Sequence, residues 1–503
     1  MHGLDRTRAP SPDIRASAIV ALALLTLAGC MTWKAGEGGT EAVLAGRPDK
    51  VRVLLANGNQ VELDSPVLSG DSLLGLSSGR RMAVALERVR GVEVRRFSVA
   101  RTALFVGAGV TAVIIAVNVS EDDSPPQPEP HVSCPLVYSW DGEGWRLDSG
   151  TFGGAITEGL ARTDVDNLEY ARSSPDGVVR LKVANELAET DHLDALRLMA
   201  VDHASGTMVA PTPDGSILGI GALRRPSRAR DVRGHDALER LAAVDGWSWE
   251  SALSHPADRD GLELEFPRPH GAAEGRLVVD AHNTPWSAFL LTEYVRAHGD
   301  ELGDWYAAMD ADPERARLFF GRLARDAFLE VAIWTPDGWR PQGLAWEAGP
   351  EIVKRQVIPL DLTGVEGGTV RVRLSAPASF WLIDHVAIDF GPAPPVTVRE
   401  LAARDARTRD GADVLPEIAA PDGRTWTIET GDWAEVTFAV PPVPEGSTRS
   451  YLLASTGWYR VDARRDGEPD RELLARFENE AGAIARLSRE RRDRALAALA
   501  EAR

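Results

Sequence analysis

Short runs of alternating apolar residues, separated by turn dipeptides, cover the chain from residue 132 to about residue 459. Alternation with a period of two places the apolar side chains on one face of a β-strand, and Asp-Gly favours the tight turns that join neighbouring strands. Asp-Gly dipeptides lie between such runs, among them Asp141-Gly142, Asp176-Gly177, Asp214-Gly215, Asp337-Gly338 and Asp422-Gly423. The pattern predicts a mainly β fold, with a large β-sandwich over residues 132–460.

Two of the predicted hairpins share one frame, in which two tryptophans flank a four-residue connection. The frames run from Trp140 to Trp145 and from Trp334 to Trp339. Such a connection brings the two rings opposite one another across the hairpin, where an aromatic pair is favourable. We therefore expect a stabilised hairpin at both positions.

Two longer segments of the chain have a helical rather than a strand pattern. The first is a helical insertion over residues 286–325, with Asp312-Pro313 beginning its second helix. The second is a C-terminal helix over residues 468–503. Its apolar stripe consists of Leu473, Phe477, Ile484 and Leu487. We expect this helix to dock on the body or on another chain.

The segment from Phe328 to Phe390 contains Trp339 in its hairpin, followed by VIPLDLTGVEGGTVRVRLSAPASFWLIDHVAIDF. A strand ending in a Leu-Asp turn, a Gly-rich link, an arginine-flanked strand and Trp381-x-x-Asp384 follow one another there. These residues resemble the closing half of galactose-binding-like jelly rolls. The resemblance implies a jelly-roll-like architecture for the sandwich, and many domains of that fold bind sugars.

At the N-terminus, three arginines precede an uncharged apolar run from Ala16 to Gly29, which closes on Leu27-Ala28-Gly29-Cys30. The run has the length of the apolar region of a signal peptide and is short for a membrane-spanning helix. The closing residues resemble the lipobox of bacterial lipoproteins. That resemblance implies that residues 1–29 are a cleaved signal peptide and that Cys30 is acylated. The alternative is a chance cysteine at the end of an ordinary signal peptide.

If Cys30 carries the lipid, Cys134 has no partner for an intrachain disulfide. Cys134 begins an apolar run, so a buried structural thiol is favoured over a nucleophile. As a whole, the chain from SCPLVYSWDGEGW to YLLASTGWY resembles uncharacterised bacterial lipoproteins. The resemblance implies a location in the bacterial cell envelope, with a body that is periplasmic or surface-exposed.

A linker over residues 30–49 precedes five short strand-like runs within residues 50–98. The runs are Val51–Leu55, Gln60–Leu63, Ser72–Leu76, Met82–Leu86 and Gly91–Arg96. Their close spacing predicts a small β-barrel, and the segment resembles Sm-like and SH3-like small barrels. No aromatic residue lies between Trp33 and Phe97 to stack on a base, so a structural or oligomerising barrel is favoured over an RNA-binding one.

Residues 102–120 are uncharged and apolar, and residues 121–131 form a Pro-rich linker. A bilayer-spanning helix needs roughly 20 such residues, so this predicted hydrophobic helix can just span. The basic residues before it would place the barrel in the cytoplasm, whereas a lipidated Cys30 places the barrel outside. Three interpretations therefore remain: a spanning helix, a helix that lies on an envelope membrane or packs against copies of itself, and a buried core helix.

The chain is acidic, with 75 Asp and Glu against 56 Lys and Arg and a net charge of −19. Because binding to phosphates requires a basic surface, we expect no nucleic-acid partner. The sequence holds no His-Glu-x-x-His, no Gly-x-Ser-x-Gly, no Walker loop and no Gly-x-Gly-x-x-Gly opening a helix. We therefore predict no catalytic residues, no metal site and no cofactor.

Two weaker chemical candidates remain. Asp280 and His282 alternate in a predicted strand and so share a face, which is the minimum that a hydrolase needs. Asp258-Arg-Asp260-Gly261, followed by Glu263, begins like an EF-hand calcium loop but lacks its later ligands. A surface turn is favoured there over calcium binding.

Tryptophan is the residue type most suited to binding a sugar, and all but Trp33 lie between residues 140 and 458. Core packing is the more common role of a single tryptophan. Four tryptophans have polar neighbours in the sequence, so we expect them to be exposed and able to bind a ligand: Trp247, Trp249, Trp305 and Trp346.

The sequence thus predicts a lipid-anchored cell-envelope protein that acts as a structural or interaction module. Its expected partners are the membrane, through lipidated Cys30 and residues 102–120, and other envelope proteins or glycans. The alternatives are a glycan-binding lipoprotein that uses exposed tryptophans of the jelly-roll region, and a hydrolase that uses Asp280 and His282.

Overall fold

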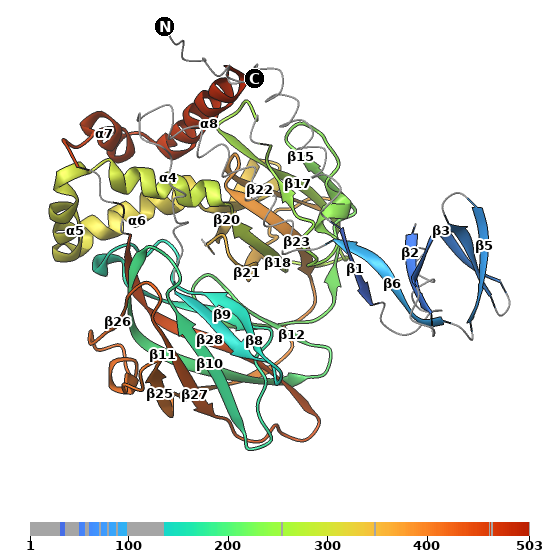
Figure 1. Cartoon of the computed structure of the whole chain (residues 1–503). Helices are drawn as coiled ribbons and strands as arrows, with labels where there is room; N and C mark the ends of the chain where they lie inside the picture. Colours follow the sequence, from blue (N-terminus) through green and yellow to red (C-terminus); the bar gives the residue numbers. More distant parts are fainter. Residues whose placement is uncertain are drawn as a thin grey trace, which may run out of the picture. The chain divides into compact units, whose positions relative to one another are not determined.

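The computed structural model describes residues 31–35, 50–55, 60–69, 72–77, 80–86, 89–97, 135–252, 255–346, 349–461, 463 and 466–501. The signal peptide, Cys30, the hydrophobic segment 102–120, the Pro-rich linker 121–131 and Cys134 lie outside these residues and stay predictions. Antiparallel strands dominate the described chain, which confirms the mainly β fold class (Figure 1). The chain divides into two compact units, one N-terminal and one that holds the body.

The N-terminal unit is a six-stranded antiparallel sheet in the order β1-β6-β2-β3-β4-β5. Its strands are β1 (Met31–Ala35), β2 (Lys50–Leu55), β3 (Gln60–Ser69), β4 (Ser72–Ser77), β5 (Arg80–Ala85) and β6 (Val89–Phe97). All five predicted runs form strands, and β1 is an additional strand within the predicted linker 30–49. The register of β3 against β4 shifts between Asp64 and Val67, where Pro66 cannot donate a ladder hydrogen bond. Closure of this sheet into a barrel stays a prediction.

The body consists of two β-sandwiches, where the sequence predicted one. The first sandwich has two sheets around a shared apolar core. One sheet contains β25 (Asp405–Thr408), β27 (Trp433–Ala439), β10 (Val178–Ala184), β7 (Leu136–Trp140) and β8 (Trp145–Gly150). The other contains β24 (Val396–Ala402), β11 (Glu189–Ala204), β28 (Ser447–Val461) and β9 (Arg162–Leu168), with β26 (Trp426–Ile428) beside β11.

The second sandwich is likewise built from two sheets around its own core. One sheet contains β15 (Arg228–Asp231), β17 (Arg259–Pro267), β22 (Thr369–Pro377), β19 (Leu329–Thr335) and β20 (Gly338–Ala345). The other contains β14 (Leu223–Arg224), β23 (Trp381–Asp389), β18 (Glu274–Asn283) and β21 (Lys354–Asp361), with β16 (Trp249–Glu250) beside β23. A hairpin of β12 (Met208–Pro211) and β13 (Ile217–Ile220) leads from the first sandwich into the second.

The two sandwiches share one strand topology. We name four blocks of consecutive strands: block A is β7–β11, block B is β14–β18, block C is β19–β23 and block D is β24–β28. The first sandwich combines blocks A and D, and the second combines blocks C and B. When A is matched to C and D to B, strand by strand, every neighbour in the sheets of the first sandwich has its counterpart in the second.

The sequence of blocks B and D supports the same correspondence. Residues 229–249 and 406–426 align without a gap at a constant separation of 177 residues. The identical pairs are Ala229 and Ala406, Arg230 and Arg407, Gly234 and Gly411, Asp236 and Asp413, Leu238 and Leu415, Ala242 and Ala419, Ala243 and Ala420, Asp245 and Asp422, Gly246 and Gly423, and Trp249 and Trp426. The body is therefore an internal repeat in which the outer blocks, A and D, enclose the sandwich formed by the inner blocks, B and C.

The repeated tryptophan frames occupy equivalent hairpins of the two sandwiches. In the first, the ring centroids of Trp140 and Trp145 lie 5.4 Å apart and the ring planes make an angle of 74°. In the second, Trp334 and Trp339 lie 5.3 Å apart at 75°. These T-shaped pairs confirm the predicted aromatic contact across each hairpin.

An arginine from the neighbouring strand lies over each tryptophan pair. Arg180 is 4.7 Å from the ring of Trp140, and Arg371 is 5.0 Å from the ring of Trp334. Each arginine also forms an ion pair with a glutamate of the partner block, Arg180 with Glu435 at 2.7 Å and Arg371 with Glu263 at 3.1 Å. The same set of side chains therefore connects A to D and C to B.

The predicted helical insertion is confirmed between β18 and β19. It consists of α4 (Pro285–Arg296), α5 (Leu302–Ala311) and α6 (Pro313–Ala327). The hydroxyl of Thr284 accepts a hydrogen bond at the start of α4, and the carboxylate of Asp312 accepts two at the start of α6. Each cap is followed by a proline at the first helical position, where no intrahelical donor is needed.

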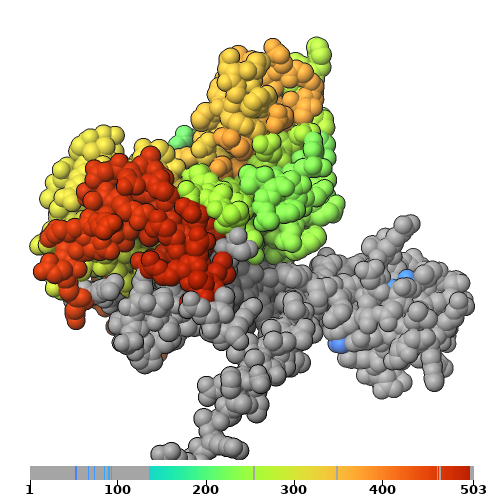
Figure 2. Space-filling model, turned by 90° about the horizontal axis from the view of Figure 1, so that it is seen from above, coloured from blue at the N-terminus to red at the C-terminus, as the bar shows by residue number. Residues whose placement is uncertain are grey.

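The C-terminal segment forms two helices instead of the single predicted one. They are α7 (Arg471–Asn479) and α8 (Ala483–Glu501), and the break between them includes Gly482 at φ = +74°. Both pack on the body, where Trp286 of α4 donates from Nε1 to the hydroxyl of Ser488 at 3.0 Å. Figure 2 shows α7 and α8, in red, against the yellow helices of the insertion. None of the helices in the described part of the chain is long and apolar enough to cross a membrane.

A buried ion triplet joins the two sandwiches. Lys354 of β21 extends its ammonium group to Asp164 at 2.9 Å and Asp166 at 2.6 Å, both on β9. All three side chains are less than a tenth exposed. Because all three charged groups are buried away from water, removing any one of them leaves buried charge without its compensating partner and destabilises the fold.

We predict that Lys354→Met lowers the free energy of unfolding by about 3–5 kcal/mol, because it removes the ammonium group that bonds to two buried carboxylates. Chemical denaturation followed by circular dichroism measures the change. Arg317→Gln, which breaks an exposed ion pair on α6, is the control and is expected to cost less than about 1 kcal/mol. Equal effects of the two substitutions would contradict the structural importance of the triplet.

Candidate functional site

Asp280 and His282, the predicted catalytic pair, contact different partners in the structure. Asp280 is 1% exposed and accepts hydrogen bonds from Arg355 Nε and His385 Nδ1, both at 2.8 Å. His282 lies with its Nδ1 3.2 Å from the carbonyl oxygen of Pro350. Burial lowers the pKa of His282 to about 4, so this imidazole is neutral at pH 7.

The histidine that binds Asp280 is therefore His385, the residue that follows Asp384 in β23. The register of β18 against β23 pairs Asp280 with His385, and this pairing cannot be read from either strand alone. Arg355 also forms an ion pair with Glu169 of the first sandwich at 2.7 Å. The Asp280 cluster is thus a second polar connection between the sandwiches.

Two of the four tryptophans expected to be exposed are buried, so the predicted exposure is wrong for Trp249 and Trp305. Trp249 is 8% exposed because it belongs to β16 and packs in the core of the second sandwich. Trp305 is 7% exposed because α5 directs it against Tyr294 and Phe319. The polar residues next to these tryptophans in the sequence did not predict whether the side chains point to the solvent or into the core.

The other two tryptophans differ in exposure. Trp247 is 44% exposed, as expected. Trp346 is half-buried, with its ring 5.4 Å from that of Phe320. The four tryptophans therefore do not form one binding surface, and a different tryptophan, Trp334 at 39%, is among the exposed ones.

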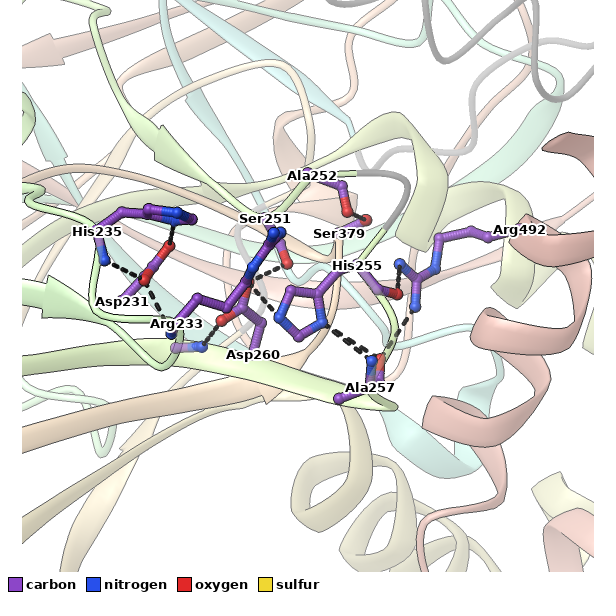
Figure 3. A network of polar contacts seen from close by, with 11 residues as sticks. Asp231, Arg233, His235, Ser251, Ala252, His255, Ala257, Asp260, Ser379 and Arg492 are labelled. Atoms are coloured by element: carbon purple, nitrogen blue, oxygen red, sulfur yellow. Dashed lines mark hydrogen bonds and ion pairs between the residues drawn. The ribbon is translucent and has the colours of Figure 1, made fainter.

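Of the residues that resemble the start of a calcium loop, Asp260 belongs to a buried network instead (Figure 3). Asp260 accepts a hydrogen bond from the hydroxyl of Ser251 at 2.5 Å, and it lies 3.4 Å from Nε2 of His255. Asp258 forms an ion pair with Arg489 of α8 at 2.5 Å. Within the described ranges, no group of three or more acidic, histidine or cysteine side chains could hold a metal ion.

This network contains a serine, a histidine and an aspartate, but not in the order that hydrolysis requires. A catalytic triad places the histidine between the serine and the acid, whereas Ser251 here donates directly to Asp260. Arg492 of α8 is fully buried beside it and donates to the carbonyl oxygens of His255 and Ala257. The network therefore attaches α8 to the second sandwich.

A cavity of about 390 Å³ lies between the helical insertion, the two C-terminal helices and the second sandwich. Its volume lies within the range of roughly 300–1,000 Å³ that is usual for small-molecule sites. The apolar wall is formed by the following residues: Leu290, Leu291, Tyr294, Trp305, Met309, Leu318, Phe319, Leu323, Phe328, Phe380, Phe477 and Ile484. We name this cavity the helical pocket.

Tyr294 of α4 is the centre of the aromatic wall. Its ring centroid lies 5.8 Å from that of Trp305, 5.5 Å from that of Phe319 and 4.8 Å from that of Phe477. The contacts with Trp305 and Phe477 are T-shaped, a favourable arrangement because the positive edge of one ring meets the negative face of the other. Burial raises the pKa of Tyr294, so its hydroxyl stays protonated. Tyr294 thus connects four helices, α4, α5, α6 and α7.

The lining of the helical pocket also contains charged residues beside the apolar wall. Most of the acids already have partners: Asp312 caps α6, Glu314 pairs with Arg317 at 2.6 Å, and Asp326 accepts from the amide of Gly482 at 2.9 Å. The side chains of Arg315 and Arg322 make no hydrogen bond or ion pair with any residue that the structure describes. The pocket combines an apolar wall with two available cations.

The helical pocket could not be predicted from the sequence. Its aromatic residues come from α4, α5, α6, α7 and the connections that hold Phe328 and Phe380, and each alone has the spacing of an ordinary core residue. The one available signal was the pair of arginines seven residues apart on a single helix, Arg315 and Arg322, which share a face.

Comparisons with known proteins add no functional assignment. No protein-family model and no curated protein matches the chain. One solved structure with a weak likeness is the cryo-EM structure of the arabinofuranosyltransferase AftD from Mycobacteria, at 8% identity and a TM-score of 0.11. The match covers 94% of this chain and 38% of that one, and a likeness at this score carries no argument.

Two buried carboxyl groups in the first sandwich provide a test of its electrostatics. Glu189 and Asp191 of β11 are 3% and 0% exposed, and the two carboxyl groups interact with each other. Burial raises the pKa of both, and the nearby Asp191 raises that of Glu189 further. These two groups therefore bind more protons in the folded protein than in the unfolded chain above the ordinary glutamate pKa of 4.5.

We predict that Glu189→Gln removes a contribution that lowers the free energy of unfolding as the pH rises above about 4.5, so the variant loses less stability with rising pH than the unsubstituted protein. The variant releases one fewer proton on unfolding, which changes the pH dependence of the unfolding free energy by up to about 1.4 kcal/mol per pH unit. Urea denaturation between pH 4 and pH 8 measures the slope. Glu400→Gln, an exposed position on β24, is the control and should leave the slope as in the unsubstituted protein.

Proposed function

We propose that the chain is a non-catalytic binding protein of the bacterial cell envelope, anchored by a lipid on Cys30, and that the helical pocket is its ligand site. The observation that carries the proposal is the pocket itself, a cavity of about 390 Å³ with an aromatic and aliphatic wall. Apolar concave sites with a few polar groups are the usual form of small-molecule sites. The ligand class supported by this wall is a small apolar or amphipathic molecule.

The location in the envelope rests on the N-terminal residues. Leu27-Ala28-Gly29-Cys30 follows an apolar run of signal-peptide length, and this motif supports export and acylation. A membrane anchor would hold the helical pocket near a source of amphipathic molecules. Contacts with other envelope proteins remain compatible with this proposal, because the pocket occupies only the helical end of the body.

We predict that Ile484→Trp weakens binding of the fluorescent probe 1-anilinonaphthalene-8-sulfonate. Ile484 lines the helical pocket and is half-buried, so the larger indole fills the cavity from α8. Fluorescence titration of the unsubstituted protein should show one saturable site, and the variant should show at least a tenfold loss of affinity.

Val398→Trp adds the same side chain at an exposed position on β24 and is the matched control. It should bind the probe as the unsubstituted protein does. Circular dichroism confirms that both variants are folded. Undiminished probe binding by folded Ile484→Trp would contradict the assignment of the helical pocket.

Glycan binding is the second candidate function, and one observation favours it. Trp334 is 39% exposed beside Trp339, with Arg371 and Arg373 within 5.4 Å of the Trp339 ring. An exposed indole with adjacent cations can stack on a sugar ring and donate hydrogen bonds to its hydroxyl groups. This surface replaces the four scattered tryptophans as the candidate for a glycan site.

For this candidate we predict that the protein sediments with purified peptidoglycan and that Trp334→Ala reduces the bound fraction at least threefold. Loss of the exposed ring removes the stacking surface but leaves the core of the second sandwich unchanged. Trp145→Ala, at the equivalent hairpin of the first sandwich, serves as the comparison and should bind normally. An unchanged bound fraction for Trp334→Ala would exclude this surface.

A further inference from the structure

The two available cations of the helical pocket lie on one face of α6. Arg315 and Arg322 are seven residues apart, which is two helical turns, so their side chains leave the helix in nearly the same direction. Arg315 is exposed and Arg322 is half-buried. Both line the cavity. They therefore mark a boundary between the solvent and the apolar wall.

An exposed apolar residue lies between them. Leu318 is 46% exposed and also lines the pocket, one turn from each arginine. The next residues inward from this face are Phe319, which is half-buried, and Leu323, which is buried. Along α6 the pocket thus passes from charge to apolar surface, the order in which an amphipathic molecule presents its own head and tail.

The acids of the pocket leave these arginines available. Asp312 and Glu314 lie within the same helical turn as Arg315, but Asp312 accepts from backbone amides and Glu314 is bonded to Arg317. Glu478 of α7 is the remaining exposed acid of the lining. Among the charged groups of the lining that have no established partner, two are guanidinium groups and one is a carboxylate. This excess of positive charge favours a ligand with a negative charge.

We propose that the ligand of the helical pocket is an anionic single-chain amphiphile, with its chain along the aromatic and leucine wall and its carboxylate or phosphate group between Arg315 and Arg322. This inference rests on the proposed function. Arginine binds both groups through paired N–H donors, so the two arginines suit either head group. The volume of about 390 Å³ suits one chain, because it lies near the lower end of the usual range for ligand sites.

The test is isothermal titration of the full chain carrying Cys30→Ala, so that no anchor lipid competes for the pocket. The probes share one chain and differ in the head group: dodecanoate, dodecyl phosphate, dodecanol and dodecyltrimethylammonium. We expect the two anions to bind at least tenfold more tightly than dodecanol, and the cation to bind most weakly. Added NaCl should weaken the anions and leave dodecanol unchanged, because salt screens the exposed charges.

Arg315→Gln combined with Arg322→Gln should reduce the affinity for both anions about tenfold and leave dodecanol binding unchanged. The matched control combines Arg424→Gln with Arg471→Gln, which removes the same charge at two exposed ion pairs outside the lining. It should bind all four probes normally. Glu478→Gln should tighten binding of the anions about twofold, since it removes the opposing carboxylate.

The outcomes separate this inference from the proposed function. Equal binding of dodecanoate and dodecanol, with no effect of the arginine substitutions, would overturn the anionic ligand but keep an apolar pocket. Binding of none of the four probes by folded protein would overturn both. A preference for dodecyl phosphate over dodecanoate, or the reverse, identifies which head group the two arginines select and supports the inference in either case.

Discussion

The pairing of block A with block D, across most of the body's length, is the constraint on which the rest of the structure depends. Strand β11 pairs with β28 from Glu189 to Ala204, and this long ladder brings the first and last parts of the body into one sandwich. Blocks B and C are then left to pair with each other, which they do with the same topology. Because the helical insertion connects B to C, it emerges from the second sandwich, and α7 and α8 reach it directly after β28.

The helical pocket follows from this arrangement. Five helices converge on one side of the body, and aromatic rings in T-shaped contact do not fill the space between them completely. The surrounding contacts are polar and specific: Ser488 binds Trp286, Arg492 binds two carbonyl oxygens, and Gly482 donates to Asp326. These bonds hold the helices apart at defined positions, so the cavity is part of the fold. The buried triplet of Lys354, Asp164 and Asp166 performs the same task between the sandwiches.

Local patterns predicted the elements well and their partners poorly. Alternation and Asp-Gly turns identified the mainly β body, and the Trp-to-Trp frames predicted two real aromatic pairs, because each depends on neighbouring residues. The division into two sandwiches depends on pairing between residues more than 200 positions apart, which alternation does not encode. The same limit explains why His385 was missed as the partner of Asp280, and why Trp249 and Trp305 were expected at the surface. The break at Gly482 was missed because apolar periodicity continues through it.

Hydrogen–deuterium exchange of the full chain with and without dodecanoate tests the central claim most directly, that the helical pocket is a ligand site. Occupation of the pocket should slow exchange in α4, α6 and α7, whose side chains form the wall, and leave β10 and β27 of the first sandwich unchanged. Those two strands lie in a sheet that contributes no residue to the lining, so they report any general stabilisation. Protection confined to the helices is the predicted result. Unchanged exchange at saturating dodecanoate, or equal protection of the helices and of the two strands, would contradict the account.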